Sequence, residues 1–228
     1  MPDLAERLAD VDARIATAMR ASGRAPDDVT RIVVTKFHPP ELVAELYALG
    51  VRDVGENRQQ ELSAKREELR GLDGLRWHFI GQAQTNKARA VRASADAVHS
   101  VDRVRIADAL HAADPTGGPL DVLLQVNLTS DSGRGGASLD EVDALAGHVA
   151  EHCPSLRLRG VMAVAPLDQD PAAAFERLAA ASLALRAVVP AATWISAGMT
   201  GDFVEAISAG ATHLRIGSAI TGPRPDRG

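Results

Sequence analysis

The sequence predicts an α/β fold made of one closed (β/α)8 barrel with an additional helix at the N-terminus. Eight short runs of β-branched or apolar residues alternate with longer stretches of helical periodicity, and this alternation is typical of βαβ units and a parallel sheet. An open doubly wound sheet of eight strands would be large for 228 residues, whereas barrels commonly use this much chain. Because no low-complexity linker divides the chain, we expect residues 1–228 to form a single domain.

The additional helix is predicted by apolar residues that recur at spacings of three and four, the pattern of one buried helical face. These residues are Leu4, Leu8, Val11, Ile15 and Met19. Gly23 and then Pro26 supply a stop. Since the chain after the last strand is short, we expect this helix to occupy the eighth position outside the barrel.

The remaining elements follow in strict alternation. We expect strands at 31–36, 51–55, 76–81, 97–101, 120–128, 157–163, 193–197 and 212–217. The expected helices lie near 40–49, 57–70, 84–93, 102–113, 138–152, 171–188 and 201–209. Residues 223–228 lack apolar side chains other than proline, so we expect a frayed tail.

Composition excludes several classes of function. A net charge of -5 argues against a broadly basic nucleic-acid binder, and only 3% aromatic residues argue against a stacking platform for single strands. Cys153 is the only cysteine and cannot form an internal disulfide, as is usual in a reducing cytosol. Residues 1–23 lack the apolar core of a signal peptide, and no run approaches the ~18 apolar residues of a spanning helix. We expect a cytoplasmic protein that binds neither nucleic acid nor membrane.

Lys36 ends the first strand, and loops after barrel strands share one mouth. Alternation along the strand puts Ile32, Val34 and Lys36 on one face, which is the barrel interior if Arg31 points outward. A lysine among apolar walls loses solvation, which favours the neutral amine that attacks an aldehyde to form an imine. Lys36 is therefore a candidate Schiff-base lysine; the alternative is a surface lysine at a loop start.

Two loops near the C-terminus carry an anion-binding pattern. Gly198, Thr200 and Gly201 run from the seventh strand into a helix, and Gly217 and Ser218 follow the eighth strand. Glycines and hydroxyl residues at such turns offer unpaired N–H groups to an anion, and these two loops form the recurrent phosphate site of barrels. The alternative is that the glycines serve only as turn and cap residues. We expect a phosphate.

Arg215 lies near the end of the eighth strand, which closure of the barrel would bring beside the strand of Lys36. A permanently charged arginine that faces a heteroaromatic nitrogen donates a hydrogen bond and keeps this nitrogen unprotonated. Its alternative role is an ion pair with Asp53 or Glu56. A lysine, a phosphate cradle and a cation between them match the aldehyde, phosphate and pyridine ring of pyridoxal 5'-phosphate (PLP).

The sequence resembles the pyridoxal phosphate homeostasis proteins, which share the barrel of the alanine racemase N-terminal domain, a TIM-type barrel of fold type III. The resemblance runs from about residue 3 to 224 and rests on VVTKFHP, DVGENRQQE, RWHFIGQAQTNKAR, VHSVDR, LLQVNL, RGVMAVAP and ISAGMTGDFVEAISAGATHLRIGSAITG. The chain departs from the usual pattern at Thr200, where Ser is more frequent, at Arg134, where Lys is common, and at Ala83, where Leu is usual.

The resemblance implies a site and a role. Lys36 would form the Schiff base with PLP, Arg215 would face the pyridine nitrogen, and Asn57 would lie near the cofactor. The phosphate contacts would come from Thr200, Gly217 and Ser218. The resemblance also implies storage or delivery of PLP, with transient contacts to PLP-dependent apoenzymes, and we expect a monomer.

Two enzyme hypotheses compete with this role. A racemase of this cofactor class needs a second base opposite the lysine, typically a tyrosine, and Tyr47 on the first outer helix is the only tyrosine. An unprotonated ring nitrogen also makes PLP a weaker electron sink. We therefore favour a non-catalytic PLP-binding protein over a racemase with an unrecognised base such as His78, and over a phosphosugar aldolase that uses Lys36.

The most polar cluster elsewhere contains His78, Gln84, Asn86 and Lys87, on the third strand and the start of its helix. We favour a satisfied strand histidine over a base at His78, and a solvated helix lysine over a cofactor relay at Lys87. The remaining histidines show no ligand spacing, so we expect no metal.

Overall fold

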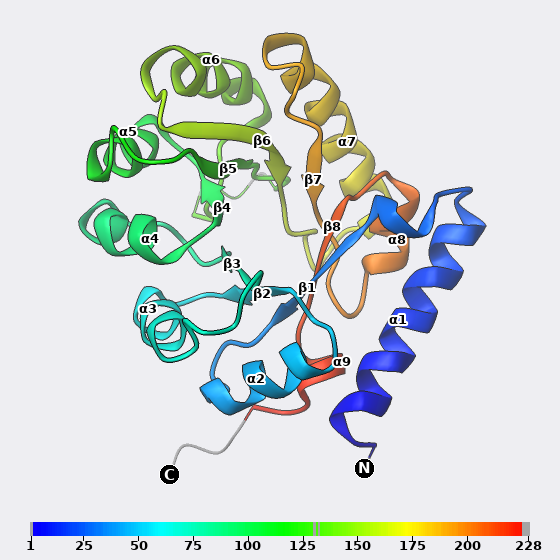
Figure 1. Ribbon diagram of the computed structural model, residues 1–228. Coiled ribbons are helices and arrows are strands. Elements are labelled where there is room, and N and C mark those ends of the chain that lie inside the picture. Colours follow the sequence, from blue (N-terminus) through cyan, green and yellow to red (C-terminus); the bar gives the residue numbers. More distant parts are fainter. Residues whose placement is uncertain (1, 130, 132, 225–228) are drawn as a thin grey trace.

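The short apolar runs form eight parallel strands that close into a barrel in the order β1-β2-β3-β4-β5-β6-β7-β8 (Figure 1). The computed structural model describes residues 2–129, 131 and 133–224. The strands are β1 Thr30–Val34, β2 Asp53–Glu56, β3 Arg76–Phe79, β4 Ala97–Val101, β5 Leu120–Gln125, β6 Leu156–Met162, β7 Trp194–Ser196 and β8 His213–Ile216. The barrel prediction is confirmed and the open sheet is rejected, because β8 pairs with β1 in parallel.

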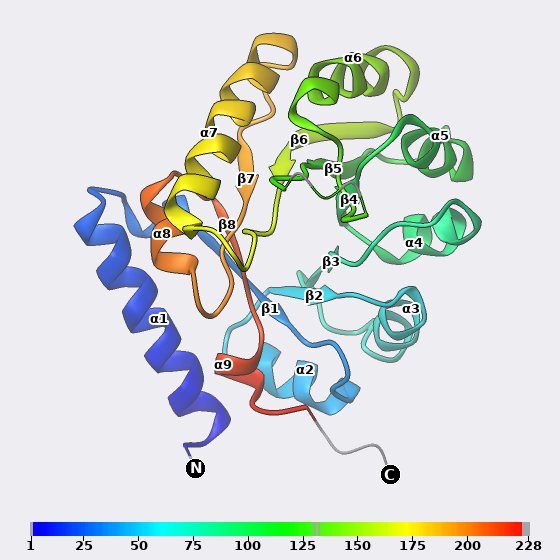
Figure 2. The same ribbon diagram turned by 180° about the vertical axis from the view of Figure 1, so that it is seen from behind.

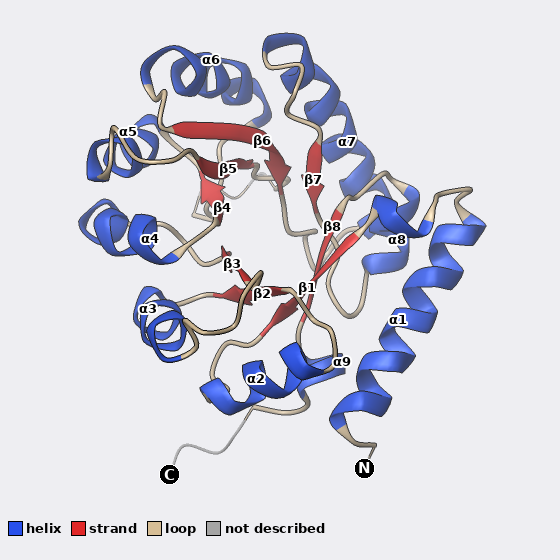
Figure 3. Cartoon of the chain, in the orientation of Figure 1, coloured by secondary structure: helices blue, strands red, loops and turns tan. Residues whose placement is uncertain are grey.

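Helices surround the barrel on the outside, with one helical segment after each strand (Figures 2 and 3). The α-helices are α1 Leu4–Ala21, α2 Pro40–Ala48, α3 Gln59–Glu68, α4 Ala88–Ser94, α5 Val104–Ala113, α6 Val142–His152, α7 Pro171–Val188, α8 Phe203–Ser208 and α9 Ser218–Thr221. Three 3-10 turns add η1 Pro26–Asp28, η2 Thr85–Lys87 and η3 Leu139–Glu141. The turn η1 and the helix α9 were not predicted from the sequence. Among the described residues, no helix combines the length and apolarity needed to cross a membrane.

Some strands end earlier than the sequence predicts. The fifth strand stops at Gln125 instead of residue 128, because the side-chain oxygen of Asn127 accepts hydrogen bonds from the N–H and the hydroxyl of Thr129, at 2.9 and 2.8 Å. This local turn competes with the strand ladder. Of the tail predicted to fray, residues 225–228 lie outside the described part of the chain.

The N-terminal helix takes the predicted eighth outer position, beside α8 and α9 (Figure 1). A capping box of Asp3 and Glu6 begins it. Arg31 of β1 forms an ion pair with Asp12 of α1 at 2.6 Å, and the Arg7 Nε donates to the backbone oxygen of Ile220 at 2.7 Å. Arg31 therefore points outward, which was the condition for placing Lys36 on the inner face.

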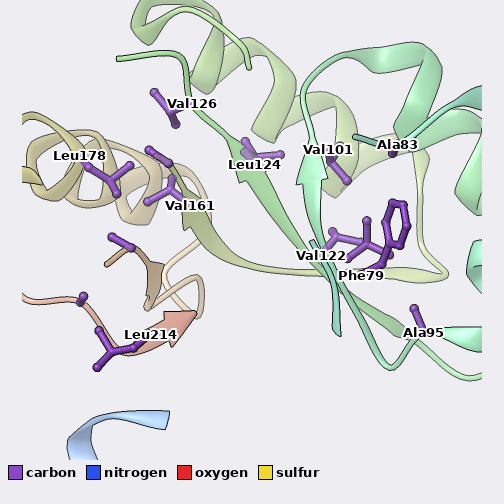
Figure 4. Close-up of a cluster of buried hydrophobic side chains, with 14 of the residues drawn as sticks. Phe79, Ala83, Ala95, Val101, Val122, Leu124, Val126, Val161, Leu178 and Leu214 are labelled. Carbon is purple, nitrogen blue, oxygen red and sulfur yellow. The ribbon is translucent and has the colours of Figure 1, made fainter. Parts of the chain in front are cut away.

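The main apolar core lies between the strands and the helices. Figure 4 shows part of it, where Val122 and Leu124 of β5 and Val161 of β6 lie in one cluster with Leu178 of α7. The outward-facing Val33 of β1 belongs to this layer. Burial of this continuous layer supplies the main favourable free energy of folding.

The barrel interior also holds a buried polar cluster, which was not predicted from the sequence. Neighbouring strands contribute buried ionisable and hydroxyl side chains to it. These are Asp53, His78, His99, Ser196, His213 and Arg215. His78 donates or accepts at both ring nitrogens, toward Asp53 and His99, so the interpretation of His78 as a satisfied strand histidine is confirmed.

Candidate functional site

A cavity of about 340 Å³ opens at the carboxyl ends of the strands. It is lined by Val34, Lys36, Asn57, Ile80, Val164, Met199, Thr200, Gly201, Arg215, Gly217 and Ser218. All six residues that the sequence analysis assigned to a PLP site lie in this wall, although they come from four separate strand ends. The barrel gathers them because the carboxyl ends of all its strands meet at one mouth.

Lys36 reaches this cavity from the end of β1. The residue is exposed, and its Nζ lies 5.9 Å from the centre of the Phe37 ring. Directly below it, Val34 is 7% exposed and Ile32 is fully buried, so the predicted inner face is correct. The expectation of a desolvated lysine is wrong, because the side chain extends beyond these apolar residues into the open mouth.

Helix α3 holds the backbone on both sides of Lys36. The Lys65 Nζ donates to the backbone oxygen of Thr35 at 2.9 Å. The N–H of Phe37 donates to the Glu61 carboxylate at 2.9 Å. Phe37 has a φ of 69°, a left-handed conformation that is uncommon for a non-glycine residue and costs of order 1–3 kcal/mol. Two hydrogen bonds from one helix thus fix the turn that directs Lys36.

A buried ion pair lies behind this turn. The Lys65 Nζ is 2.6 Å from the Glu56 Oε1, which also accepts from the Thr35 hydroxyl at 2.6 Å. Glu56 is fully buried, and its Oε2 has no partner among the described residues. Burial raises the pKa of Glu56, and the charge and hydrogen bond of Lys65 partly offset this rise. The pair links the ends of β1 and β2, where Lys36 and Asn57 follow.

Replacing Lys65 with methionine is expected to lower the free energy of unfolding by about 3 kcal/mol at neutral pH, because it leaves the Glu56 carboxylate buried and unpaired. Glu56 keeps its proton to a higher pH in the folded protein than in the unfolded chain, where its pKa is 4.5. Its contribution to stability is therefore fully present below 4.5 and is lost as the pH rises through the folded pKa. Without Lys65 that folded pKa rises further.

Denaturant titrations between pH 4.5 and 8 measure this effect. Lys65→Met should lose stability more steeply with rising pH than the wild type. The matched control is the double variant Lys65→Met/Glu56→Gln, which keeps the volume and removes the charge, and it should lack the additional pH dependence. Equal slopes in the single and double variants would contradict the assignment to Glu56.

The turn after β7 offers N–H groups to the cavity. Asp202 begins α8 and accepts from the N–H of Met199 at 2.6 Å. The N–H groups of Thr200 and Gly201 have no hydrogen-bond partner in the described part of the chain. Unpaired backbone donors at a concave surface attract an anion. Gly217 and Ser218 on the opposite turn line the same cavity, so the residues predicted to bind a phosphate lie together.

Arg215 enters the cavity from its floor. Its Nη1 donates to the Ser196 hydroxyl at 2.6 Å and its Nη2 to the backbone oxygen of Ala163 at 2.8 Å. Burial lowers the pKa of Arg215 to about 10, and the charge of Asp202 partly opposes this shift. Arg215 thus remains a cation at neutral pH. Opposite it on β1 lies Ile32, so the predicted closure of β8 against β1 is confirmed.

The alternative ion pairs of Arg215 are wrong. Asp53 instead contacts Arg76 at 2.8 Å and His78 at 2.9 Å, and Glu56 pairs with Lys65. Because Asp53 lies at the opposite end of the barrel from the mouth, it is out of direct reach of Arg215. Lys87 lies at the end of η2 and does not line the cavity, so nothing in the geometry favours it as a cofactor relay.

Asn57 and Gly81 meet at the edge of the cavity. The side-chain oxygen of Asn57 is buried without a partner among the described residues. A Cβ at Gly81 would lie 1.9 Å from the backbone oxygen of Asn57, so only glycine fits there. Sequence reasoning missed Gly81, and a glycine at the end of the expected strand 76–81 was the only signal for it.

Another group was not visible from sequence spacing. Asp108, His148 and Cys153 bring one ligand-type atom each within 4.8 Å of one another. The His148 Nε2 lies 2.7 Å from the Asp108 Oδ1, and burial raises the pKa of Cys153 to about 11. The Cys153 thiol also donates to Asp108, and the expectation of no metal stays a prediction.

Comparison with known proteins identifies the family. The family profile "Alanine racemase, N-terminal domain" matches residues 8–225. The pyridoxal phosphate homeostasis protein of Escherichia coli strain K12 is 40% identical over 230 residues, which cover 98% of each chain. The chain belongs to the pyridoxal phosphate homeostasis protein family. Its relative of that name from Pseudomonas aeruginosa PAO1 is 42% identical over 228 residues, 98% of this chain and 97% of the relative.

Solved structures resemble this family member over nearly its whole length. PipY of Synechococcus elongatus PCC7942, solved with PLP bound, has a TM-score of 0.84 at 33% identity and covers 96% of this chain and 100% of its own. An unknown protein from Bifidobacterium adolescentis has a TM-score of 0.89 at 28% identity and covers 95% of this chain and 94% of its own. Alanine racemase from Corynebacterium glutamicum shares the fold at 15% identity and a TM-score of 0.66, over 96% of this chain and 62% of the racemase.

Proposed function

We propose that this chain binds PLP through a Schiff base to Lys36 and takes part in intracellular PLP homeostasis, by storing or delivering the cofactor without catalytic turnover. One observation carries the proposal. A single cavity joins an exposed amine, a cradle of backbone N–H and hydroxyl groups and a buried cation. The homeostasis proteins of the family and the PLP-bound PipY support it.

The residues present fit PLP. When bound, PLP supplies an aldehyde for the lysine amine and a pyridine ring that accepts electrons. Lys36 holds the aldehyde end, while Thr200, Gly217 and Ser218 hold the phosphate. The partnerless oxygen of Asn57 supplies a hydrogen-bond acceptor at the edge of the site, and Arg215 supplies a donor at its floor.

Arg215 is proposed to donate a hydrogen bond to the ring nitrogen. Since its pKa of about 10 keeps it protonated, this nitrogen stays without a proton and the ring withdraws electrons weakly. We expect Arg215→Ala to shift the absorption spectrum of the bound cofactor and to weaken binding about tenfold or more, the cost of one charged hydrogen bond. Titration of the apoprotein with PLP measures both; an unchanged spectrum and affinity would remove this role.

Thr200 is proposed to bond the phosphate through its hydroxyl, in place of the more usual serine. Thr200→Ala should weaken PLP binding by about 1 to 3 kcal/mol, while Thr200→Ser should bind as the wild type does. Equilibrium dialysis of the three proteins measures the difference. Equal affinity in the alanine variant would exclude the contact.

The geometry disfavours the racemase alternative. The hydroxyl of Tyr47 donates to the backbone oxygen of Asp73 on the outside of the barrel, and His78 is 1% exposed inside the barrel with both ring nitrogens engaged. Neither residue lines the cavity, so neither is positioned as the second base. Conversion of L-alanine to the D-isomer at enzymatic rates, lost on Lys36→Ala, would instead establish a racemase.

The decisive experiment is an absorption spectrum of the purified protein before and after borohydride. A PLP-binding protein is yellow, and borohydride traps one cofactor per chain on Lys36. A phosphosugar aldolase would be colourless and would be trapped only with its sugar present. A colourless protein that takes up no PLP overturns the proposal.

Partners and compartment follow from the same proposal. Delivery of PLP requires transient contact with apoenzymes, and we propose that the chain acts as a monomer in the cytoplasm. Cys153, a free and buried thiol, fits a reducing compartment.

A further inference from the structure

A continuous chain of side-chain hydrogen bonds crosses the barrel interior. It begins at Arg215 in the cavity floor and passes to Ser196 at 2.6 Å. It continues from Ser196 to His99 Nδ1 at 2.9 Å, from His99 Nε2 to His78 Nδ1 at 2.9 Å, and from His78 Nε2 to Asp53 at 2.9 Å. We call these five residues the interior chain. They come from strands β8, β7, β4, β3 and β2.

With both imidazoles neutral, the chemistry of the two ends permits only one arrangement of protons. The Arg215 guanidinium only donates, so the Ser196 oxygen accepts from it. In this arrangement the Ser196 proton points to His99 Nδ1. His99 then carries its proton on Nε2 and donates to His78 Nδ1. His78 in turn donates from Nε2 to the Asp53 carboxylate, which only accepts. A cation at one end and an anion at the other thus orient every bond between them.

The charge states required by this arrangement agree with the surroundings. Burial lowers the pKa of His99 well below its usual value, so His99 is neutral. Burial opposes ionisation of Asp53, but hydrogen bonds from His78 and Arg76 outweigh it and hold the Asp53 pKa below its usual value. Burial lowers the Arg215 pKa only to about 10. The chain therefore keeps its cation, its anion and a neutral His99 between them at neutral pH.

Of the ionisable groups around the chain, Arg76 shares the Asp53 carboxylate with His78, and the others engage different partners. His213 of β8 lies 6.4 to 6.5 Å from the rings of His78 and His99. Its Nδ1 contacts the Thr212 hydroxyl, and burial lowers its pKa to about 3. Arg76 contacts the Asp53 Oδ1 at 2.8 Å, the same oxygen that faces His78. Arg159 lies over the Trp194 ring and makes an ion pair with Asp121. The Asp202 carboxylate accepts from the N–H of Met199.

We propose that Asp53, His78 and His99 are positioning residues that, through the Ser196 hydroxyl, fix the orientation and polarisation of Arg215 toward the ligand in the cavity. This inference rests on the proposed function, because the effect on a ligand is read out on PLP. A hydrogen bond polarised from both ends is stronger than an isolated one. The carboxylate at the far end of the barrel is thus the remote counterion of the cation that faces the cofactor.

The first test needs no cofactor. Long-range ¹H–¹⁵N spectra of the apoprotein at neutral pH report which ring nitrogen of each histidine carries the proton. We expect both His78 and His99 as neutral rings protonated at Nε2. A proton on Nδ1 of either ring, or a doubly protonated ring, overturns the inference whatever the protein binds.

The second test compares His99→Leu with His111→Leu. The control is matched, because His111 of α5 also bonds a serine hydroxyl, that of Ser155 at 2.8 Å, but lies outside the barrel. We expect His99→Leu to raise the PLP dissociation constant about tenfold, the effect of one lost buried hydrogen bond, and to shift the spectrum of bound PLP. The control should match the wild type. A folded His99→Leu protein with unchanged affinity and spectrum overturns the inference.

A third variant covers the case in which His99→Leu does not fold. Asp53→Asn keeps the shape and an acceptor oxygen but removes the remote charge, so the pH at which bound PLP changes its spectrum should shift; an unchanged titration overturns the inference. A wild-type protein that takes up no PLP would instead sink the proposed function, and the histidine spectra would still decide the proton arrangement of the interior chain.

Discussion

Replacement of Lys36 with alanine is expected to leave the protein folded but unable to hold PLP covalently. Borohydride should trap one cofactor per chain in the wild type and none in Lys36→Ala, and the yellow colour should be lost. The physical reason is that, among the residues that the structure describes, Lys36 is the only lysine in the wall of the cavity. The neighbouring Lys65 is buried and engaged with Glu56 and the Thr35 backbone, so it cannot substitute.

Mass spectrometry after borohydride reduction and proteolysis measures the site of attachment. The control is Lys87→Ala, which removes a lysine of η2 that does not line the cavity. It should be labelled at Lys36 as the wild type is. Labelling that persists in Lys36→Ala would mean that another amine carries the cofactor and that the proposed site is wrong.

Fold-level features were predictable because they depend on local patterns. Alternation of apolar runs and helical periodicity gave eight strands, and the rule that barrel loops share one mouth then brought Lys36, Thr200 and Arg215 into one wall. Their proximity needed only the strand ends and closure of β8 on β1. The exposure of Lys36 was mispredicted, because alternation reports which face a residue occupies but not where the barrel wall ends.

The supporting residues were not predictable for a different reason. Lys65 stands in a helix rich in charged residues, QQELSAKREE, and nothing in such a pattern distinguishes a buried lysine from a solvated one. Its burial is decided by Glu56 on a neighbouring strand. Likewise, His99 and Ser196 are 97 positions apart and meet only across the barrel interior. Contacts of this kind depend on register and shear, which sequence periodicity does not specify.

Substitution of Gly81 is expected to have as large an effect as substitution of Lys36. The effect arises from a loss of stability, not from the loss of a reacting group. Gly81→Ala would place a methyl group 1.9 Å from the backbone oxygen of Asn57. The backbone of Asn57 cannot move aside as a flexible side chain can. The ends of strands β2 and β3 must therefore separate. We expect the free energy of unfolding to fall by about 3 kcal/mol and PLP binding to weaken, because Asn57 forms part of the cavity wall.

Gly147→Ala is the matched control for this prediction. Gly147 lies within α6, and a Cβ there would meet no atom within 4 Å. The same added methyl group should therefore stabilise the protein by up to about 1 kcal/mol, because alanine favours the helix more than glycine does. Denaturant titration and PLP affinity of both variants separate the steric clash at Gly81 from the general effect of adding a methyl group. If Gly81→Ala proved as stable as the wild type and bound PLP equally well, the close approach of β3 to Asn57 would not be a constraint on the site.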